Sequence, residues 1–180
     1  MKRYVRSANI SLTNESNNDL YEILDNPNLR KGALAQLALS DVDYIREGVA
    51  QHPNVDTDTL DKLVQDPEYM VCYYALSNPN ISEATLRKAV DYANNRGNRT
   101  EESGMKSCIA QHKNTPADIL DRLSTDWSIS VRTKVAKNPN TSVDTLLAMA
   151  RSPIEDSWVK AEVVQNLLNR GEHEAVHSLH

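Results

Sequence analysis

Apolar residues recur along this chain in two alternating sets, each with the spacing of one helix face. The first set consists of five adjacent pairs: Ile23/Leu24, Val49/Ala50, Ala75/Leu76, Ile109/Ala110 and Val135/Ala136. The second set consists of five pairs of residues three apart: Leu34/Leu37, Leu60/Leu63, Leu86/Ala89, Leu120/Leu123 and Leu146/Met149. Further apolar residues, four positions before the first set, extend its i, i+3, i+4 spacing: Ile45, Val71, Met105 and Val131. The pattern predicts repeated units of a short helix, a turn and a second helix, each helix with one buried face.

A polar turn separates the two helices of each unit. Its copies are His52-Pro53-Asn54, Asn78-Pro79-Asn80, His112-Lys113-Asn114 and Asn138-Pro139-Asn140. Proline has no amide hydrogen and disfavours helical geometry in the residue before it, so the first helix must end there. The asparagine that follows tolerates left-handed backbone and bonds within its own turn, so we expect a structural role for this column. We expect His52 and His112 to cap helices.

The turns give the chain a period. Measured at the proline position, the origins Pro27, Pro53, Pro79, Lys113 and Pro139 lie 26, 26, 34 and 26 residues apart. A fixed period of this length is typical of stacked helical repeats. Helices this short need stacking between units to be stable, because isolated helices of fewer than about 12 residues are marginal in water.

The motif V-R-x-x-V-A-x-N-P-N-T over residues 131–141, followed by L-x-x-M-A-x-S-P over residues 146–153, resembles the variant leucine-rich repeat, an all-helical unit. The resemblance covers about residues 19–153. It implies an all-α, right-handed α-α superhelix, or solenoid, of about five repeats of roughly 26 residues. It implies no single activity. The iron–sulfur module of the founding protein is not expected here, because Cys72 and Cys108 are the only cysteines.

Two regions break the period. Residues 92–104, YANNRGNRTEESG, are polar and contain glycine, so we expect an inserted, protruding loop. Near the C-terminus, Trp158, Val159, Val163 and Val164 repeat the first-helix pattern but no Pro-Asn turn follows. We therefore expect one α-solenoid domain over residues 1–180, with an N-terminal cap over 1–18, repeats over 19–91 and 105–153, and a C-terminal cap over 154–180.

Composition narrows the choice of partner and compartment. The 180 residues carry a formal net charge of -5, so bulk charge does not favour nucleic acid. Cys72 and Cys108 form no CxxC motif, and the chain shows no signal peptide or membrane-spanning run. We expect a cytoplasmic protein without a cofactor. His173, His177 and His180 share a helical spacing at the chain end, which is too weak a pattern to predict a metal site.

One candidate site is a basic ladder, defined here as Arg46, Lys106 and Arg132, which occupy the same position of three units. Cys72 interrupts the ladder in the remaining unit, and Lys160 matches it in the C-terminal cap. The functional interpretation is a stripe that binds acidic protein or phosphate. The alternative is ion pairing within the chain, with Asp43, Asp126 and Asp156 as the expected partners.

The other candidate residues are aromatic or lie in the expected loop. Tyr73 and Tyr74 occupy positions that are polar or small in the other units, which suggests an exposed anchor, extended by Tyr69 one turn earlier. The alternative is that they pack beneath the loop that starts at Tyr92. Arg99 lies in that loop, where recognition residues are common in repeat arrays.

No catalytic motif occurs in the chain: GxSxG, HExxH, Walker and glycine-rich dinucleotide patterns are all missing. The sequence therefore favours a non-catalytic scaffold that binds a protein partner through Tyr73, Tyr74, Arg46, Lys106, Arg132 and Arg99. A narrower version is a phage or mobile-element inhibitor of a nucleic-acid enzyme. The alternative is a solenoid that binds nucleic acid through a continuous, unpaired basic ladder. No membrane or small-molecule partner is indicated.

Overall fold

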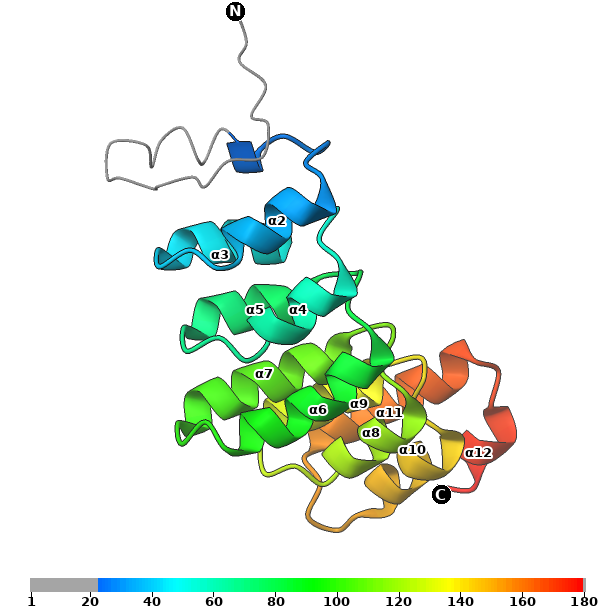
Figure 1. Ribbon diagram of the computed structural model, residues 1–180. Coiled ribbons are helices and arrows are strands. Elements are labelled where there is room, and N and C mark those ends of the chain that lie inside the picture. Colours follow the sequence, from blue (N-terminus) through cyan, green and yellow to red (C-terminus); the bar gives the residue numbers. More distant parts are fainter. Residues whose placement is uncertain (1–22, 180) are drawn as a thin grey trace, which may run out of the picture.

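A computed structural model describes residues 23–179, in which all regular secondary structure is helical (Figure 1). The helices are α2 (Lys31–Leu37), α3 (Asp43–Gln51), α4 (Thr57–Leu63), α5 (Tyr69–Ser77), α6 (Glu83–Asn94), α7 (Arg99–Gln111), α8 (Ala117–Leu123), α9 (Ile129–Lys137), α10 (Val143–Arg151), α11 (Ser157–Asn169) and α12 (His173–His177). The prediction of an all-α protein is confirmed for this part of the chain, which contains no strand.

The helices pack in the order in which they occur along the chain. The helices α3, α5, α7, α9 and α11 form a series in which each packs against its neighbours in the series, and we call these five the first helices. Each also packs against the shorter helix beside it in sequence, as α4 does with α5 and α10 with α11 (Figure 1). The chain thus advances unit by unit.

The apolar pattern of the sequence accounts for the core. Both sets of periodic residues are buried, apart from the half-buried Ile23, and they belong to one continuous cluster. Ile45, Val71, Met105 and Val131 are fully buried within the same cluster. Burying each large aliphatic side chain contributes about 1.5–3 kcal/mol, so the stacking of units is mainly hydrophobic.

The residue before the proline position joins each unit to the preceding one. The side chain of Asn138, which is 2% exposed, donates to the backbone oxygens of Ala110 (2.7 Å) and His112 (3.1 Å). Asn78 makes the same pair of contacts to the unit before it. These bonds satisfy carbonyls that the end of a first helix leaves unpaired.

The asparagine column also bonds between units. Asn140 donates to the backbone oxygens of Lys113 (2.7 Å) and Thr115 (3.0 Å), and Asn80 makes the equivalent pair of contacts two units earlier. The structural role expected for the column is confirmed, but the left-handed backbone is not. Among residues 23–179, only Gly97 and Gly171 have positive φ.

The turn histidines use both ring nitrogens. Nε2 of His112 lies 3.2 Å from the backbone oxygen of Asn78, and Nδ1 accepts from the backbone N–H of Asn114 at 3.1 Å. Since Nδ1 accepts and Nε2 faces a carbonyl, the ring must be neutral with its proton on Nε2. His52 makes the equivalent contacts.

The prediction of a protruding loop over residues 92–104 is wrong. Helix α6 continues to Asn94 and α7 begins at Arg99, so only four residues connect them. The polar residues and the glycine that suggested a loop instead mark the end of one helix and the start of the next. Gly97 takes a φ of 76° at the turn, and the Asn98 side chain accepts from the backbone N–H of Thr100 at 2.9 Å. The inserted residues lengthen two helices.

At the C-terminal side, α11 takes the place of a first helix and packs against α9 and α10. Asn166 donates to the backbone oxygens of Ala136 and Asn138, which repeats the contact of the turn asparagines. Arg170 reaches the oxygens of Thr141 and Pro139, as the asparagine column does elsewhere. The N-terminal cap predicted over residues 1–18 lies outside the described residues.

Candidate interaction surface

The basic ladder is ion-paired within the chain. Arg46 forms a two-pronged pair with Asp66, at 2.7 and 3.0 Å, and Arg132 pairs with Glu155 at 2.9 Å. All four side chains are at most 15% exposed. The expectation of a free basic stripe is therefore contradicted. The ion-pairing alternative is confirmed, although Arg46 and Arg132 pair with acids other than the predicted Asp43, Asp126 and Asp156.

Lys106, the third member of the ladder, lies between two carboxylates and is only 5% exposed. Its Nζ is 2.6 Å from Glu102 and 2.9 Å from Asp126. Burial lowers the pKa of Lys106, but the hydrogen bonds with the two acids outweigh it and leave the pKa above its ordinary value. The same contact lowers the pKa of Glu102. A cation held in this way cannot reach a partner.

Cys72 interrupts the ladder, and Arg96 from the α6–α7 connection supplies the missing guanidinium. Arg96 donates to the backbone oxygens of Asp66 (2.7 Å) and Pro67 (2.9 Å), lies 3.5 Å from the Cys72 sulfur and pairs with Glu101. Arg132 makes the equivalent carbonyl contacts two units later. The eight extra residues in this period therefore include an arginine that makes the contacts which Cys72, at the ladder position, cannot make.

The tyrosines of α5 differ in exposure. Tyr73 is 37% exposed, whereas Tyr69 and Tyr74 pack against the core with part of each ring in solvent. The ring centroids of Tyr73 lie 6.1 Å from Tyr69 and 5.7 Å from Tyr74, the latter edge to face. Since no loop covers α5, only Tyr73 of the predicted pair keeps the character of an exposed anchor.

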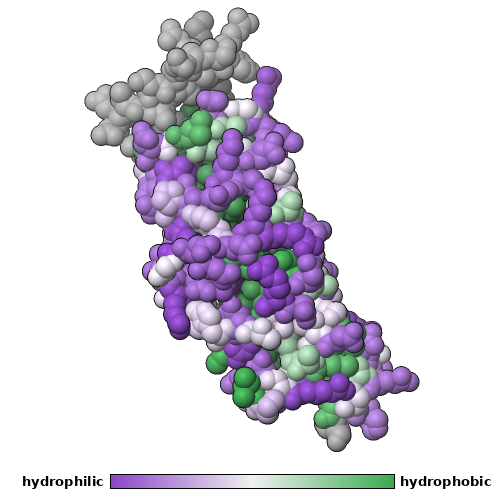
Figure 2. Space-filling view, turned by 60° about the horizontal axis from the view of Figure 1, so that its bottom comes forward, coloured by the Kyte–Doolittle hydropathy of each residue, from purple (hydrophilic) through white to green (hydrophobic). Residues whose placement is uncertain are grey.

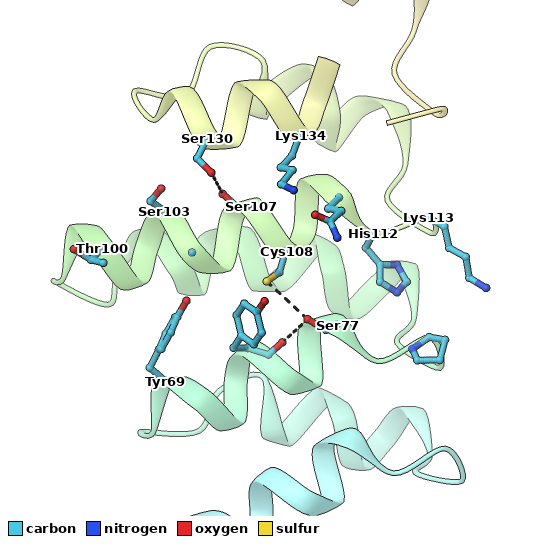
Figure 3. A pocket seen from close by; sticks show the side chains of 14 residues that line it. Tyr69, Ser77, Thr100, Ser103, Ser107, Cys108, His112, Lys113, Ser130 and Lys134 are labelled. Carbon is cyan, nitrogen blue, oxygen red and sulfur yellow. Dashed lines mark hydrogen bonds between the residues drawn. The ribbon is translucent and has the colours of Figure 1, made fainter. Parts of the chain in front are cut away.

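A groove with a volume of about 680 Å³ runs beside these tyrosines, between α5, α7 and α9 (Figure 3). We call it the tyrosine groove. Its lining residues are Tyr69, Tyr73, Ser77, Pro79, Thr100, Ser103, Gly104, Ser107, Cys108, Gln111, His112, Lys113, Ser130 and Lys134. Sequence reasoning identified Tyr69 and Tyr73 but missed the other walls. The signal in the sequence was the run of small residues on α7 opposite them.

Small side chains on α7 open the groove. Gly104 has no Cβ, and one added there would overlap the Tyr69 hydroxyl, so the glycine allows this ring to close against α7. Ser103 and Ser107 lie on the same side of α7, and each hydroxyl bonds to a serine of the adjoining unit, Ser128 (2.6 Å) and Ser130 (3.2 Å). The floor is therefore polar, uncharged and fixed in place.

The groove contains a thiol but no activated nucleophile. Burial raises the pKa of Cys108, whose sulfur contacts the Ser77 hydroxyl at 3.9 Å rather than a base. His112 also lines the groove, but burial lowers its pKa and both ring nitrogens are already bonded. Nucleophilic catalysis needs a nucleophile in contact with a base, and this pair does not provide one.

Arg99 lies on the surface, outside the groove. Its guanidinium stacks 5.3 Å from the ring centre of Trp127, which is 50% exposed. Other exposed apolar residues follow in the same part of the chain: Ile129, Ile154, Trp158 and Leu168. In Figure 2 hydrophobic residues appear at the end of the molecule near the C-terminus, within a mostly hydrophilic face. Of the six predicted residues, only Tyr73 lines the tyrosine groove.

Within residues 23–179, no three histidine, cysteine or acidic residues are grouped as a metal site would require, and no helix is both long and apolar enough to cross a membrane. His180 lies outside this range, so the predicted histidine spacing is described only for His173 and His177 of α12.

Comparison with known proteins gives no assignment. No family model, no curated protein and no solved structure matches the chain.

Proposed function

We propose that the chain is a cytoplasmic, cofactor-free scaffold that binds another protein in the tyrosine groove and catalyses no reaction. The observation that supports this proposal is an exposed aromatic residue, Tyr73, beside an open groove on the first helices. Aromatic residues in well-packed pockets carry most of the energy of many protein interfaces. Arg46, Lys106 and Arg132 of the basic ladder are already paired, which leaves the groove as the chemically distinct feature of this surface.

We further propose that the units form a right-handed α-α superhelix of the variant leucine-rich repeat type. The support is the repetition of the turn contacts, in which Asn78, Asn138 and Asn166 each donate to the two corresponding oxygens of the preceding unit. The recurrence of this pair of contacts at three steps is what a repeated rotation and translation of one unit produces.

The nucleic-acid alternative loses its main support. It depended on a continuous ladder of unpaired cations, and Arg46, Lys106 and Arg132 all bond to carboxylates of the same chain. The narrower hypothesis, an inhibitor of a nucleic-acid enzyme, gains no specific observation and remains a prediction.

The experiment that tests the proposal is comparative affinity capture from an extract of the source organism. Ser107→Trp fills the groove, Tyr73→Ser removes the exposed ring, and Trp158→Ser is the control because Trp158 is exposed but outside the groove. We expect a protein that is captured by the wild type and the control but not by the two groove variants. Undiminished capture by Ser107→Trp and Tyr73→Ser, with unchanged circular dichroism, would exclude the groove as the binding site.

A further inference from the structure

The tyrosine groove has the length of a short extended peptide. Tyr69, Tyr73 and Ser77 follow one another at i, i+4 spacing along α5 and span about 12 Å at 1.5 Å per residue. On the opposite wall, the lining residues of α7 run from Thr100 to Gln111, about 16 Å. An extended chain advances about 3.3 Å per residue, so the groove accommodates about four or five residues.

The two ends of the groove differ in chemistry. Figure 3 shows Tyr69 and Thr100 at one end and His112 and Lys113 at the other, with Lys134 on the α9 side. The first end offers an aromatic wall to an apolar side chain. The second end offers two ammonium groups.

The cationic end carries uncompensated positive charge. No carboxylate lines the groove, and neither Lys113 nor Lys134 has an ion pair among the described residues, whereas the basic ladder is fully paired. The C-terminal ends of α5 and α7 each contribute about half a negative charge through the helix dipole. Two full positive charges therefore leave this end positive, in a chain whose net charge is -5.

The middle of the groove suits a peptide backbone. Gln111 lines it with an amide that both donates and accepts hydrogen bonds. The hydroxyls of Ser77, Ser103 and Ser107 each make a hydrogen bond within the chain and keep a lone pair that can accept another. Such groups can pair with the N–H and C=O of an extended segment without selecting its side chains. Selectivity is then confined to the two ends.

We infer that the partner contributes an extended, acidic segment of four or five residues, with an apolar or aromatic side chain against Tyr69 and Tyr73 and a carboxylate, three or four residues away, at the end of the groove that Lys113 and Lys134 line. This inference rests on the proposed function, because it names the occupant of the same groove. The observations that carry it are the length of the groove, its aromatic and cationic ends and its uncharged floor.

The test is an unbiased peptide selection. A random heptapeptide library displayed on phage is selected for binding to the full chain. It is then counter-selected, in separate experiments, against the Ser107→Trp and Ser103→Trp variants, in which a tryptophan fills the groove. Circular dichroism checks that both variants fold. Enriched peptides are synthesised with fluorescein, and their affinities are measured by fluorescence polarisation. We expect enrichment of peptides with Asp or Glu three or four positions from an apolar residue.

Charge reversal gives the matched comparison. In the K113E/K134E variant we expect the affinity for these peptides to fall roughly three- to thirtyfold, since exposed charge contacts each contribute a small free energy. The K31E/K62E variant changes the net charge equally but at exposed lysines of α2 and α4, outside the groove, and should bind like the wild type.

The outcomes separate this inference from the proposed function. Enriched peptides that are lost on both fillings but carry no acid, or that bind K113E/K134E as tightly as the wild type, overturn the acidic occupant and leave a peptide groove. A selection without any filling-sensitive peptide overturns both. Binding of fluorescein-labelled oligo(dT) that K113E/K134E abolishes would assign the lysines to nucleic acid instead, against the inference.

Discussion

The buried asparagine before the proline position should be far more important for stability than the exposed asparagine after it, although both bond to the preceding unit. Asn138 is 2% exposed; it donates to the oxygens of Ala110 and His112 and accepts from the backbone N–H of Asn140 at 2.8 Å. Ala110 depends on this contact, because the N–H of Asn114, its helical partner by position, bonds to His112 instead. Asn140 also donates two hydrogen bonds, but its side chain is exposed.

The expected magnitudes follow from burial. Asn138→Ala removes three hydrogen bonds from a dry site, and at about 1 kcal/mol for each, the free energy of unfolding should fall by about 3 kcal/mol. Asn140→Ala should cost about 1 kcal/mol or less, because water replaces the lost donors. Asn138→Asp, of the same shape but without a side-chain donor, should be at least as harmful as alanine, since it turns a carboxylate toward two carbonyls.

The assay is urea unfolding at pH 7, followed by circular dichroism and by the fluorescence of Trp127 and Trp158. The wild type, the two alanine variants and Asn138→Asp are compared at equal concentration, with the slope of the transition checked for each variant. Equal losses in the Asn138→Ala and Asn140→Ala variants would refute the reasoning, because burial would then not decide the contribution of these contacts. A loss for Asn138→Asp below that for Asn138→Ala would contradict the role of the donor.

Three further predictions address other contacts. Burial lowers the pKa of His112 in the folded chain, so the contribution of neutral His112 to stability should be complete above about pH 6.5 and should decline as the pH falls. In urea unfolding between about pH 7.5 and 5, the His112→Asn variant should lose less stability with falling pH than the wild type. An equal loss in both proteins would contradict this prediction. Arg96→Ala should lower the free energy of unfolding by about 2 kcal/mol and Arg99→Ala by under about 0.5, and the reverse order would disprove the compensating role of Arg96. Gly104→Ala should stabilise the fold by about 1 kcal/mol in a Tyr69→Leu background but not in the wild type, where the added methyl group would overlap the Tyr69 hydroxyl. A double-mutant cycle of melting temperatures measures this difference, and additive effects of the two substitutions would be evidence against the contact between positions 69 and 104.

Local chemistry was enough to define the helices and their buried faces. Ile45 and Val49 lie on one helix face because of their i, i+4 spacing alone, and so do Val71 and Ala75. Pro53 and Pro79 end the helices without help from distant residues. The break at residues 92–104 was misjudged because polar, glycine-containing sequence is shared by loops and by helix ends. A glycine at positive φ and a capping asparagine distinguish the two only once the flanking helices are seen to continue.

The candidate site was decided by tertiary structure. Arg46 finds Asp66 twenty residues away, and Arg96 reaches the position that Cys72 leaves open, because the stacking of helices places side chains from different elements in contact. The sequence alone does not reveal which of the charged residues lie in contact. The same applies to the adjacent Tyr73 and Tyr74, since the 100° turn between successive helical residues directs one toward the groove and packs the other against the core. The sequence by itself determined the repeating helices; only their packing determined which charges are paired and where the surface stays open.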